Sequence, residues 1–206
     1  MRDRKDSSLR SELTKPMLEK KNLNKIKANL HSYHKRRGDV IGKSNEALHH
    51  AKRAIFAMHR DNEKEAVEKI KLVESIFKAL NNKYKKDPDI KKEGAYKAGL
   101  EEYVEAKCFY EFITTGKIGE IKELPVDGEI YLAGLCDVPG ELYRYAIRAA
   151  TNKDVAMAKK CATMGGDIVG ELIEFNLTSY LRTKFDQAKG AVNRLENVVY
   201  ELSLRE

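Results

Sequence analysis

The stretch GLEEYVEAKCFYEF, residues 99–112, decides the fold class of this chain. Its apolar residues recur every three to four positions, as in a helix that buries one face. Because each helical residue advances about 100°, Glu102 and Glu105 fall within this otherwise apolar face. Glu101 and Glu111 fall on the other side, where solvent is expected. The stretch therefore predicts a packed helix with two carboxylates on its buried face.

The same periodicity extends over most of the 206 residues, and only 4 Pro and 13 Gly interrupt it. Helices are predicted at residues 22–59, 61–84, 90–115, 129–151, 154–175 and 181–204. The sequence has few runs of alternating β-branched residues, so it gives little support for a β-sheet. We expect an all-α fold, a bundle of about six to seven mostly long helices with antiparallel neighbours. In the first helix, Gly38 and Gly42 each cost about 1 kcal/mol relative to Ala, so the helix bends there or packing compensates.

Basic residues are concentrated near the N-terminus. Residues 1–37 carry a net charge of +8, whereas the whole chain carries +7. Such a segment suits nucleic-acid binding, and a merely solubilising role fits the charge equally well. We expect residues 1–10 to be a mobile basic segment and residues 11–206 to form one helical domain.

Three cysteines, Cys108, Cys136 and Cys161, stand far apart among apolar residues. This pattern is typical of small buried side chains in a reducing compartment. No stretch approaches 18 apolar residues, and the N-terminus is polar and charged, so we expect neither a membrane span nor a secretory signal. The sequence predicts a cytoplasmic protein without a membrane partner.

A second pair of acids lies in GLCDVPGELYRYAIR, residues 134–148. Asp137 and Glu141 are four residues apart and share a helical stripe with Arg144 and Arg148. An ordinary surface ion pair between Glu141 and Arg144 would explain part of this pattern, but the two acids repel each other at this spacing. The stripe therefore predicts either surface ion pairs or a second half of an acidic site.

A proline interrupts this second motif. Pro139 removes one backbone donor from a helix, so Asp137 could instead be the N-cap of a new helix. We expect a kinked but continuous helix.

Two helices that each present two acids could converge into one site. The ordinary alternative is that Glu102 and Glu105 pair with Lys or Arg from neighbouring helices. Four converging carboxylates would be stable only with a divalent cation or when protonated, and oxygen ligands favour Mg²⁺ or Mn²⁺. A di-iron site is disfavoured because neither pair has the Glu-x-x-His spacing. The five histidines, interpreted as polar-face or nucleic-acid contacts on the first helix, are His31, His34, His49, His50 and His59.

Three segments, EEYVEAKCFYEFI, PVDGEIYLAGLCDVPGELYRYAI and NRLENVVYEL, with KRAIFAMHR earlier, resemble the translin family. The similarity covers nearly the whole chain. It is greatest to the branch of translin-associated factor X, which carries the E-Y-V-E and D-x-x-G-E-L acids, whereas translin itself lacks the complete set. Pro139 departs from the family pattern. The resemblance implies a helical bundle whose copies assemble into a hollow oligomeric barrel, an octamer or similar, that encloses RNA.

The resemblance also implies an activity. Matched residue by residue, Glu102, Glu105, Asp137 and Glu141 would be the catalytic residues and the ligands of Mg²⁺, with Mn²⁺ as a second candidate. The implied function is a metal-dependent endoribonuclease acting on single-stranded RNA, with single-stranded DNA as a further candidate ligand. A cation held by carboxylates can activate water and stabilise the transition state, so no nucleophilic side chain is required.

Basic residues must bring the RNA backbone to an acidic site. The candidates for RNA contacts are Arg37, Lys43, Lys52, Arg53, Arg144 and Arg148. Two other functions stay open from the sequence. One is a non-catalytic RNA- or single-stranded-DNA-binding protein like translin, and the other is a structural partner subunit whose acids are ion-paired.

Overall fold

The computed structural model describes residue 18 and residues 20–204. The chain divides into two units that meet between Asp39 and Val40. The segment of residues 1–10, predicted to be mobile, lies outside the described residues. The predicted single domain of residues 11–206 starts outside them too and stays a prediction.

Helix α2, Lys20–Met58, contributes to both units. In the first unit its large apolar side chains Leu23, Ile26 and Leu30 are exposed. In the second unit it buries one face, which includes Val40, Ala47 and Ala51. The helix is unbroken at both predicted weak points, Gly38 and Gly42, and the boundary between the units falls between these two glycines.

The second unit holds the other helices of the described chain. These are α3 (Glu63–Lys83), the 3-10 helix η1 (Pro88–Lys92), α4 (Gly94–Thr115), α5 (Gly128–Thr151), α6 (Val155–Leu172) and α7 (Ser179–Ser203). No strand occurs in residues 20–204. The all-α prediction and all six predicted helices are confirmed, with ends that differ by a few residues. Local signals set several starts, since Asn62, Asp127 and Asp154 each accept a hydrogen bond from the first turn of the following helix.

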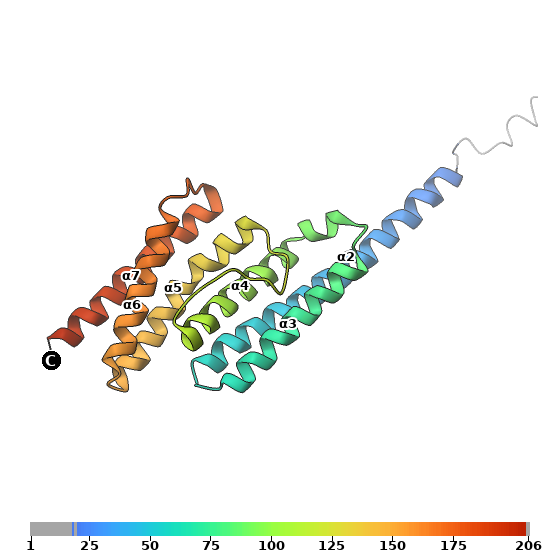
Figure 1. Cartoon of the computed structure of the whole chain (residues 1–206). Helices are drawn as coiled ribbons and strands as arrows, with labels where there is room; N and C mark the ends of the chain where they lie inside the picture. Colours follow the sequence, from blue (N-terminus) through green and yellow to red (C-terminus); the bar gives the residue numbers. More distant parts are fainter. Residues whose placement is uncertain (1–17, 19, 205–206) are drawn as a thin grey trace, which may run out of the picture. The chain divides into compact units, whose positions relative to one another are not determined.

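Helix α5 is central in the second unit and packs against α4, α6 and α7, while α3 packs against α4 (Figure 1). Most consecutive helices are antiparallel, as predicted. Helices α4 and α5 instead run in the same direction, because the connector of residues 116–127 returns along the bundle before α5 begins (Figure 1). Contacts confirm this alignment, since Gly134 approaches Glu101 and, farther along both helices, Tyr145 packs against Phe109.

The core of the second unit is one cluster of apolar side chains from all its α-helices. Its largest fully buried members include Tyr103, Phe77, Phe109, Leu142 and Leu195. Burial of this apolar area is the main driving force for folding. No helix in residues 20–204 combines the length and apolar character needed to cross a bilayer.

The three cysteines are buried and free. Burial raises the pKa of the Cys108 and Cys161 thiols to about 12 and that of Cys136 to about 11. Their predicted role as small buried side chains is confirmed.

Helix α5 contains two unusual residues beside the second acid pair. The helix continues through Pro139, which is fully buried, so the alternative in which Asp137 caps a new helix is wrong. A Cβ atom on Gly134 would lie 2.5 Å from the Glu101 carbonyl oxygen and 2.7 Å from the Val104 Cβ. The missing side chain at Gly134 therefore allows α4 and α5 to approach closely.

Candidate metal and active site

Helix α4 presents Glu102 and Glu105 toward α5. Glu105 is only 8% exposed and has no hydrogen bond or ion pair with any described residue. Glu102 has a side chain that is 18% exposed, and its one ion pair is to Lys52 Nζ at 3.7 Å. The alternative in which both acids pair closely with neighbouring cations is therefore wrong for Glu105 and holds only weakly for Glu102.

Helix α5 presents Asp137 and Glu141, and both have cationic or hydrogen-bonding partners. Asp137 forms a short ion pair with Lys184 of α7. The Glu141 carboxylate lies 2.5 Å from His59 Nε2 and 3.0 Å from Arg144 Nη1. The predicted pair of Glu141 and Arg144 is confirmed, while Lys184 and His59 are partners that the sequence did not predict.

The four carboxylates act on one another. Burial raises the pKa of Glu105 well above its usual value, and the charges of Glu102, Asp137 and Glu141 raise it further. Burial likewise raises the pKa of Glu102, with Lys52 opposing the shift and the two α5 acids adding to it. The acids of α4 and α5 thus share one electrostatic environment, as two converging pairs would.

The two acids of α5 differ in their electrostatic balance. Burial raises the pKa of Asp137, and Lys184 offsets part of this shift. Burial also disfavours the charge of Glu141, but the hydrogen bond with His59 and the charge of Arg144 hold the pKa of Glu141 below its usual value. Glu141 is therefore the acid of the four that is best prepared to stay ionised.

The arrangement of α4 and α5 explains why the two pairs meet. Because the helices are parallel and Gly134 lets them approach closely, residues one turn apart on α4 stand opposite residues one turn apart on α5. The i,i+3 pair of α4 and the i,i+4 pair of α5 therefore lie at similar heights.

The donor set suits a hard divalent cation in kind, since carboxylate oxygens are the ligands that Mg²⁺ and Mn²⁺ prefer. Among the residues that the structure describes, no three His, Cys, Asp or Glu side chains stand together in a metal-binding geometry. In this arrangement Lys184 pairs with Asp137 and His59 pairs with Glu141. Glu105, buried and without an ion-pair partner, is the acid of the four whose charge burial disfavours without a direct contact to offset it. The four carboxylates therefore fit such an ion in their chemistry, whereas the arrangement of the described residues does not form a binding site for it.

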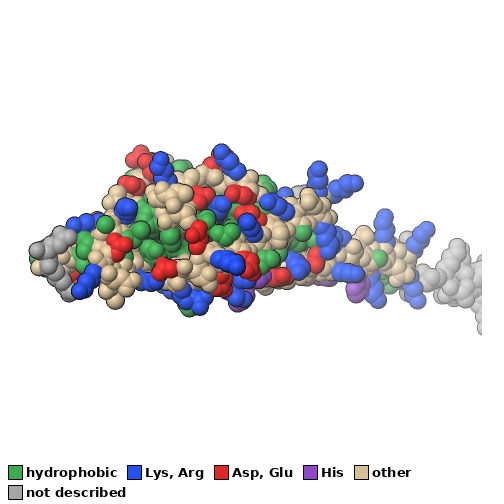
Figure 2. Space-filling view, turned by 60° about the horizontal axis from the view of Figure 1, so that its bottom comes forward, with side chains coloured by type: hydrophobic (Ala, Val, Ile, Leu, Met, Phe, Trp, Pro, Cys, Tyr) green, Lys and Arg blue, Asp and Glu red, His purple; other side chains and the backbone are tan. Residues whose placement is uncertain are grey.

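The basic residues predicted to contact RNA are scattered rather than gathered. Lys43, Arg53 and Arg148 form ion pairs with Glu46, Glu65 and Asp61, respectively. On the face of the second unit shown in Figure 2, Lys and Arg side chains are interspersed with Asp and Glu.

Two of the six predicted RNA contacts, Lys52 and Arg144, adjoin the acid cluster through Glu102 and Glu141. Arg37 belongs to the first unit, where its side chain is exposed. The structure thus brings two of the six candidates to the acids.

Three residues of the site were missed or misplaced by the sequence. Glu101, expected in solvent, is partly buried. Its Oε1 atom lies 2.5 Å from Lys184 Nζ and accepts a hydrogen bond of 2.7 Å from the Tyr180 hydroxyl. His59, interpreted as a polar-face residue, lies just beyond α2 and packs against Phe109 and Tyr145.

A signal for Lys184 was present in the sequence. It precedes Phe185 and lies four residues before Ala188 in the apolar stripe of α7, so it occupies a core-facing position.

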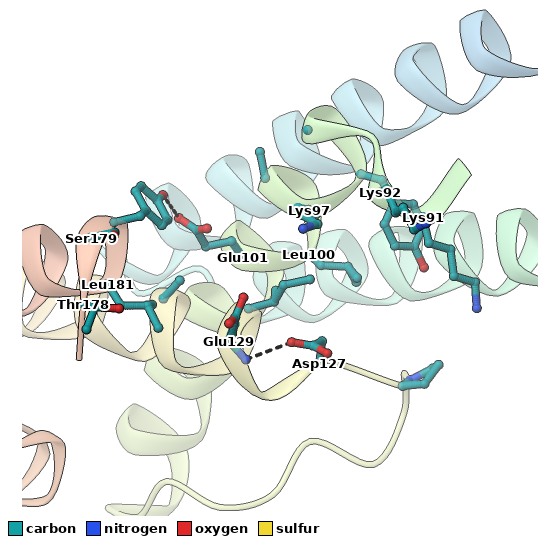
Figure 3. Close-up of a pocket in the computed structure, with 17 residues that line it drawn as sticks. Lys91, Lys92, Lys97, Leu100, Glu101, Asp127, Glu129, Thr178, Ser179 and Leu181 are labelled. Atoms are coloured by element: carbon teal, nitrogen blue, oxygen red, sulfur yellow. Dashed lines mark hydrogen bonds between the residues drawn. The ribbon is translucent and has the colours of Figure 1, made fainter. Parts of the chain in front are cut away.

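A pocket of about 1020 Å³ adjoins the site along α4 and the start of α5 and α7. Figure 3 shows Glu101 at one wall of this pocket and Lys91, Lys92 and Lys97 along another part of it. Glu101 therefore belongs both to the pocket and, through Lys184, to the acid cluster.

An all-helical bundle with paired acids on two adjacent parallel helices defines the class of this protein. The Translin family profile matches residues 25–206, and the chain belongs to the Translin family. A translin-associated protein X homolog of Schizosaccharomyces pombe is 24% identical over 198 residues, which cover 83% of this chain and 82% of that protein. An uncharacterized protein of Methanocaldococcus jannaschii is 27% identical over 179 residues, with coverage of 82% and 79%.

Solved structures show the same fold. The chain is similar to apo-NeC3PO with a TM-score of 0.80 and 26% identity, covering 90% of this chain and 98% of that one. It is similar to AfC3PO with a TM-score of 0.82, 25% identity and the same coverage. A structure of AfC3PO in complex with duplex RNA also has a TM-score of 0.82, at 24% identity. The predicted resemblance to the translin family and its factor X branch is confirmed.

Proposed function

We propose that this chain is a metal-dependent endoribonuclease that cleaves single-stranded RNA inside a homo-oligomeric barrel. The observation that carries the proposal is Glu105, a buried carboxylate without an ion-pair partner, whose pKa burial raises and the charges of three further carboxylates raise further. A soluble bundle gains no stability from such a charge, so we infer that a ligand compensates it. Membership of the Translin family and a similar structure in complex with duplex RNA support an RNA substrate.

The residues that would hold Mg²⁺, or Mn²⁺, are Glu102, Glu105, Asp137 and Glu141. When bound, the cation would supply Lewis-acid chemistry that activates water and stabilises charge on the phosphate. His59 orients Glu141 through its 2.5 Å contact. Arg144 and Lys52 place positive charge beside the acids, where RNA phosphates would otherwise be repelled. The metal, the barrel and a cytoplasmic location stay predictions.

The test is cleavage of labelled single-stranded and duplex RNA with Mg²⁺, with and without EDTA. We expect cleavage that EDTA abolishes and that Glu105→Gln or Asp137→Asn lowers by at least about a hundredfold. Glu111→Gln is the matched control, because Glu111 lies on the same helix but pairs with Lys107. Activity that survives EDTA, or both site variants, would disprove the proposal.

The second candidate is a non-catalytic RNA- or single-stranded-DNA-binding protein. The pairing of Asp137 with Lys184 and of Glu141 with Arg144 favours it, because ion-paired acids need no cation. It predicts salt-sensitive RNA binding by a protein that cleaves nothing with Mg²⁺ or Mn²⁺.

A further inference from the structure

Lys184 connects three helices at the acid site. Its side chain is 11% exposed, its Nζ lies 2.5 Å from Glu101 Oε1 of α4, and it forms a shorter ion pair with Asp137 of α5. The ammonium also faces the Tyr180 ring at 5.3 Å, and the Tyr180 hydroxyl donates to the same Glu101 carboxylate. One cation of α7 therefore bridges an acid of α4 and an acid of α5.

A lysine in this position is costly unless its charge is used. Its neighbours in the stripe of α7 are the buried Phe185, Ala188 and Ala191. Burying an ammonium group in such surroundings is unfavourable unless opposite charges compensate it. Here two carboxylates do so, while Glu105 stays without a partner. Lys184 therefore forms ion pairs with two acids of the site and none with Glu105.

We propose that Lys184 is the internal counter-ion of the acid cluster, which holds Asp137 in the cation-free protein and gives it up when a divalent cation binds. The inference rests on the proposed cation site. Asp137 cannot offer the same oxygen to an ammonium group and to a metal ion. The contact between Lys184 and Glu101 does not involve the proposed ligands, so it can persist after the exchange. Lys184 is thus a positioning residue that weakens cation binding.

The consequence distinguishes this role from a purely structural one. If Lys184 competes with the cation, removing its charge tightens cation binding and at the same time destabilises the cation-free protein. If Lys184 only supports the fold, its removal destabilises the protein and leaves cation binding unchanged or weaker. Tighter cation binding after removal of the charge therefore indicates competition, whereas unchanged or weaker binding indicates a purely structural role.

The experiment measures Mn²⁺ binding by electron paramagnetic resonance, and thermal unfolding with and without Mn²⁺, on the full chain without RNA. For Lys184→Met we expect roughly tenfold tighter Mn²⁺ binding than in the wild type, because a competing positive charge is gone. We also expect a lower melting temperature without Mn²⁺ and a larger gain on adding it. Lys189→Met is the matched control, since Lys189 is exposed on the same helix. Unchanged, weaker or absent Mn²⁺ binding in Lys184→Met overturns the proposal.

If Lys184→Met folds only with Mn²⁺, that dependence supports the proposal. If it does not fold at all, Lys184→Gln decides, because this variant removes the positive charge and keeps a polar side chain. Tighter Mn²⁺ binding than in the wild type then supports the competition, and unchanged or weaker binding overturns it. RNA cleavage by the wild type, measured separately, reports on the proposed function, so the two ideas can fail independently.

Discussion

The acid pairs of α4 and α5 meet at one site but are maintained in different ways. Glu105 is buried without an ion pair, and the partly buried Glu102 has one weak ion pair, with Lys52. Burial raises the pKa of both acids. Asp137 and Glu141 each have a close basic partner. The difference shows that the charge of the site is compensated on the α5 side and left open on the α4 side. We infer that the α4 side is where an incoming cation gains most.

The largest effect should come from separating the two pairs. A Cβ at Gly134 would lie 2.5 Å from the Glu101 carbonyl oxygen, so Gly134→Ala must push α5 away from α4. We expect a loss of about 3 kcal/mol in the free energy of unfolding, measured by urea denaturation. Gly140→Ala is the control on the same helix, because nothing lies within 4 Å of a Cβ there. It should gain about 1 kcal/mol, and equal effects of both variants would contradict the close approach.

The next largest effect on stability is expected at the α5 acids, which have basic partners. Asp137→Asn removes one of the two carboxylates that hold the buried Lys184. In the cation-free protein we expect a loss of about 2 kcal/mol in unfolding free energy, as for other hydrogen bonds between charged groups. Asp186→Asn tests an exposed ion pair of α7 and should change stability by less than about 0.5 kcal/mol. A loss no greater than that of this control would show that Lys184 does not depend on Asp137.

A smaller effect, a gain in stability, is expected when Glu105 of α4 is replaced. Since the pKa of Glu105 is higher in the folded than in the unfolded chain, its protonation favours folding at low pH, and this benefit is lost as the pH rises through the folded pKa. Without divalent cations, the stability of Glu105→Gln relative to the wild type should therefore increase as the pH rises. Melting temperatures across a pH series, with Glu111→Gln as control, test this. A variant whose stability falls with pH as steeply as the wild type's would argue against a strained carboxylate.

The smallest effect is expected for Lys52→Met. Its ion pair with Glu102 is 3.7 Å long and its side chain is 60% exposed, so solvent screens the interaction. We expect a change below about 0.5 kcal/mol in unfolding free energy by urea denaturation. A larger loss would mean that Lys52 compensates the charge of the α4 acids despite its exposure.

The helices could be predicted from sequence because apolar periodicity and capping residues are local properties. The four acids could be predicted because spacing fixes which side chains share a face of a helix. The direction of α5 relative to α4 could not, since the connector of residues 116–127 does not encode which way it returns. Partners contributed by other helices were missed for the same reason: Lys184 is 47 positions from Asp137 and His59 is 82 from Glu141. Glu101 was misplaced because a helical wheel does not show that Tyr180 and Lys184 at the start of α7 contact its carboxylate.

The three buried thiols allow local unfolding of the chain to be measured through their chemical reactivity. Cys108, Cys136 and Cys161 lie on α4, α5 and α6, one on each helix, and burial raises the pKa of each thiol. Because thiolates are the reactive form, a maleimide should label them only when the surrounding packing opens. The order in which the three react then ranks these helices by their opening free energies, without any engineered probe.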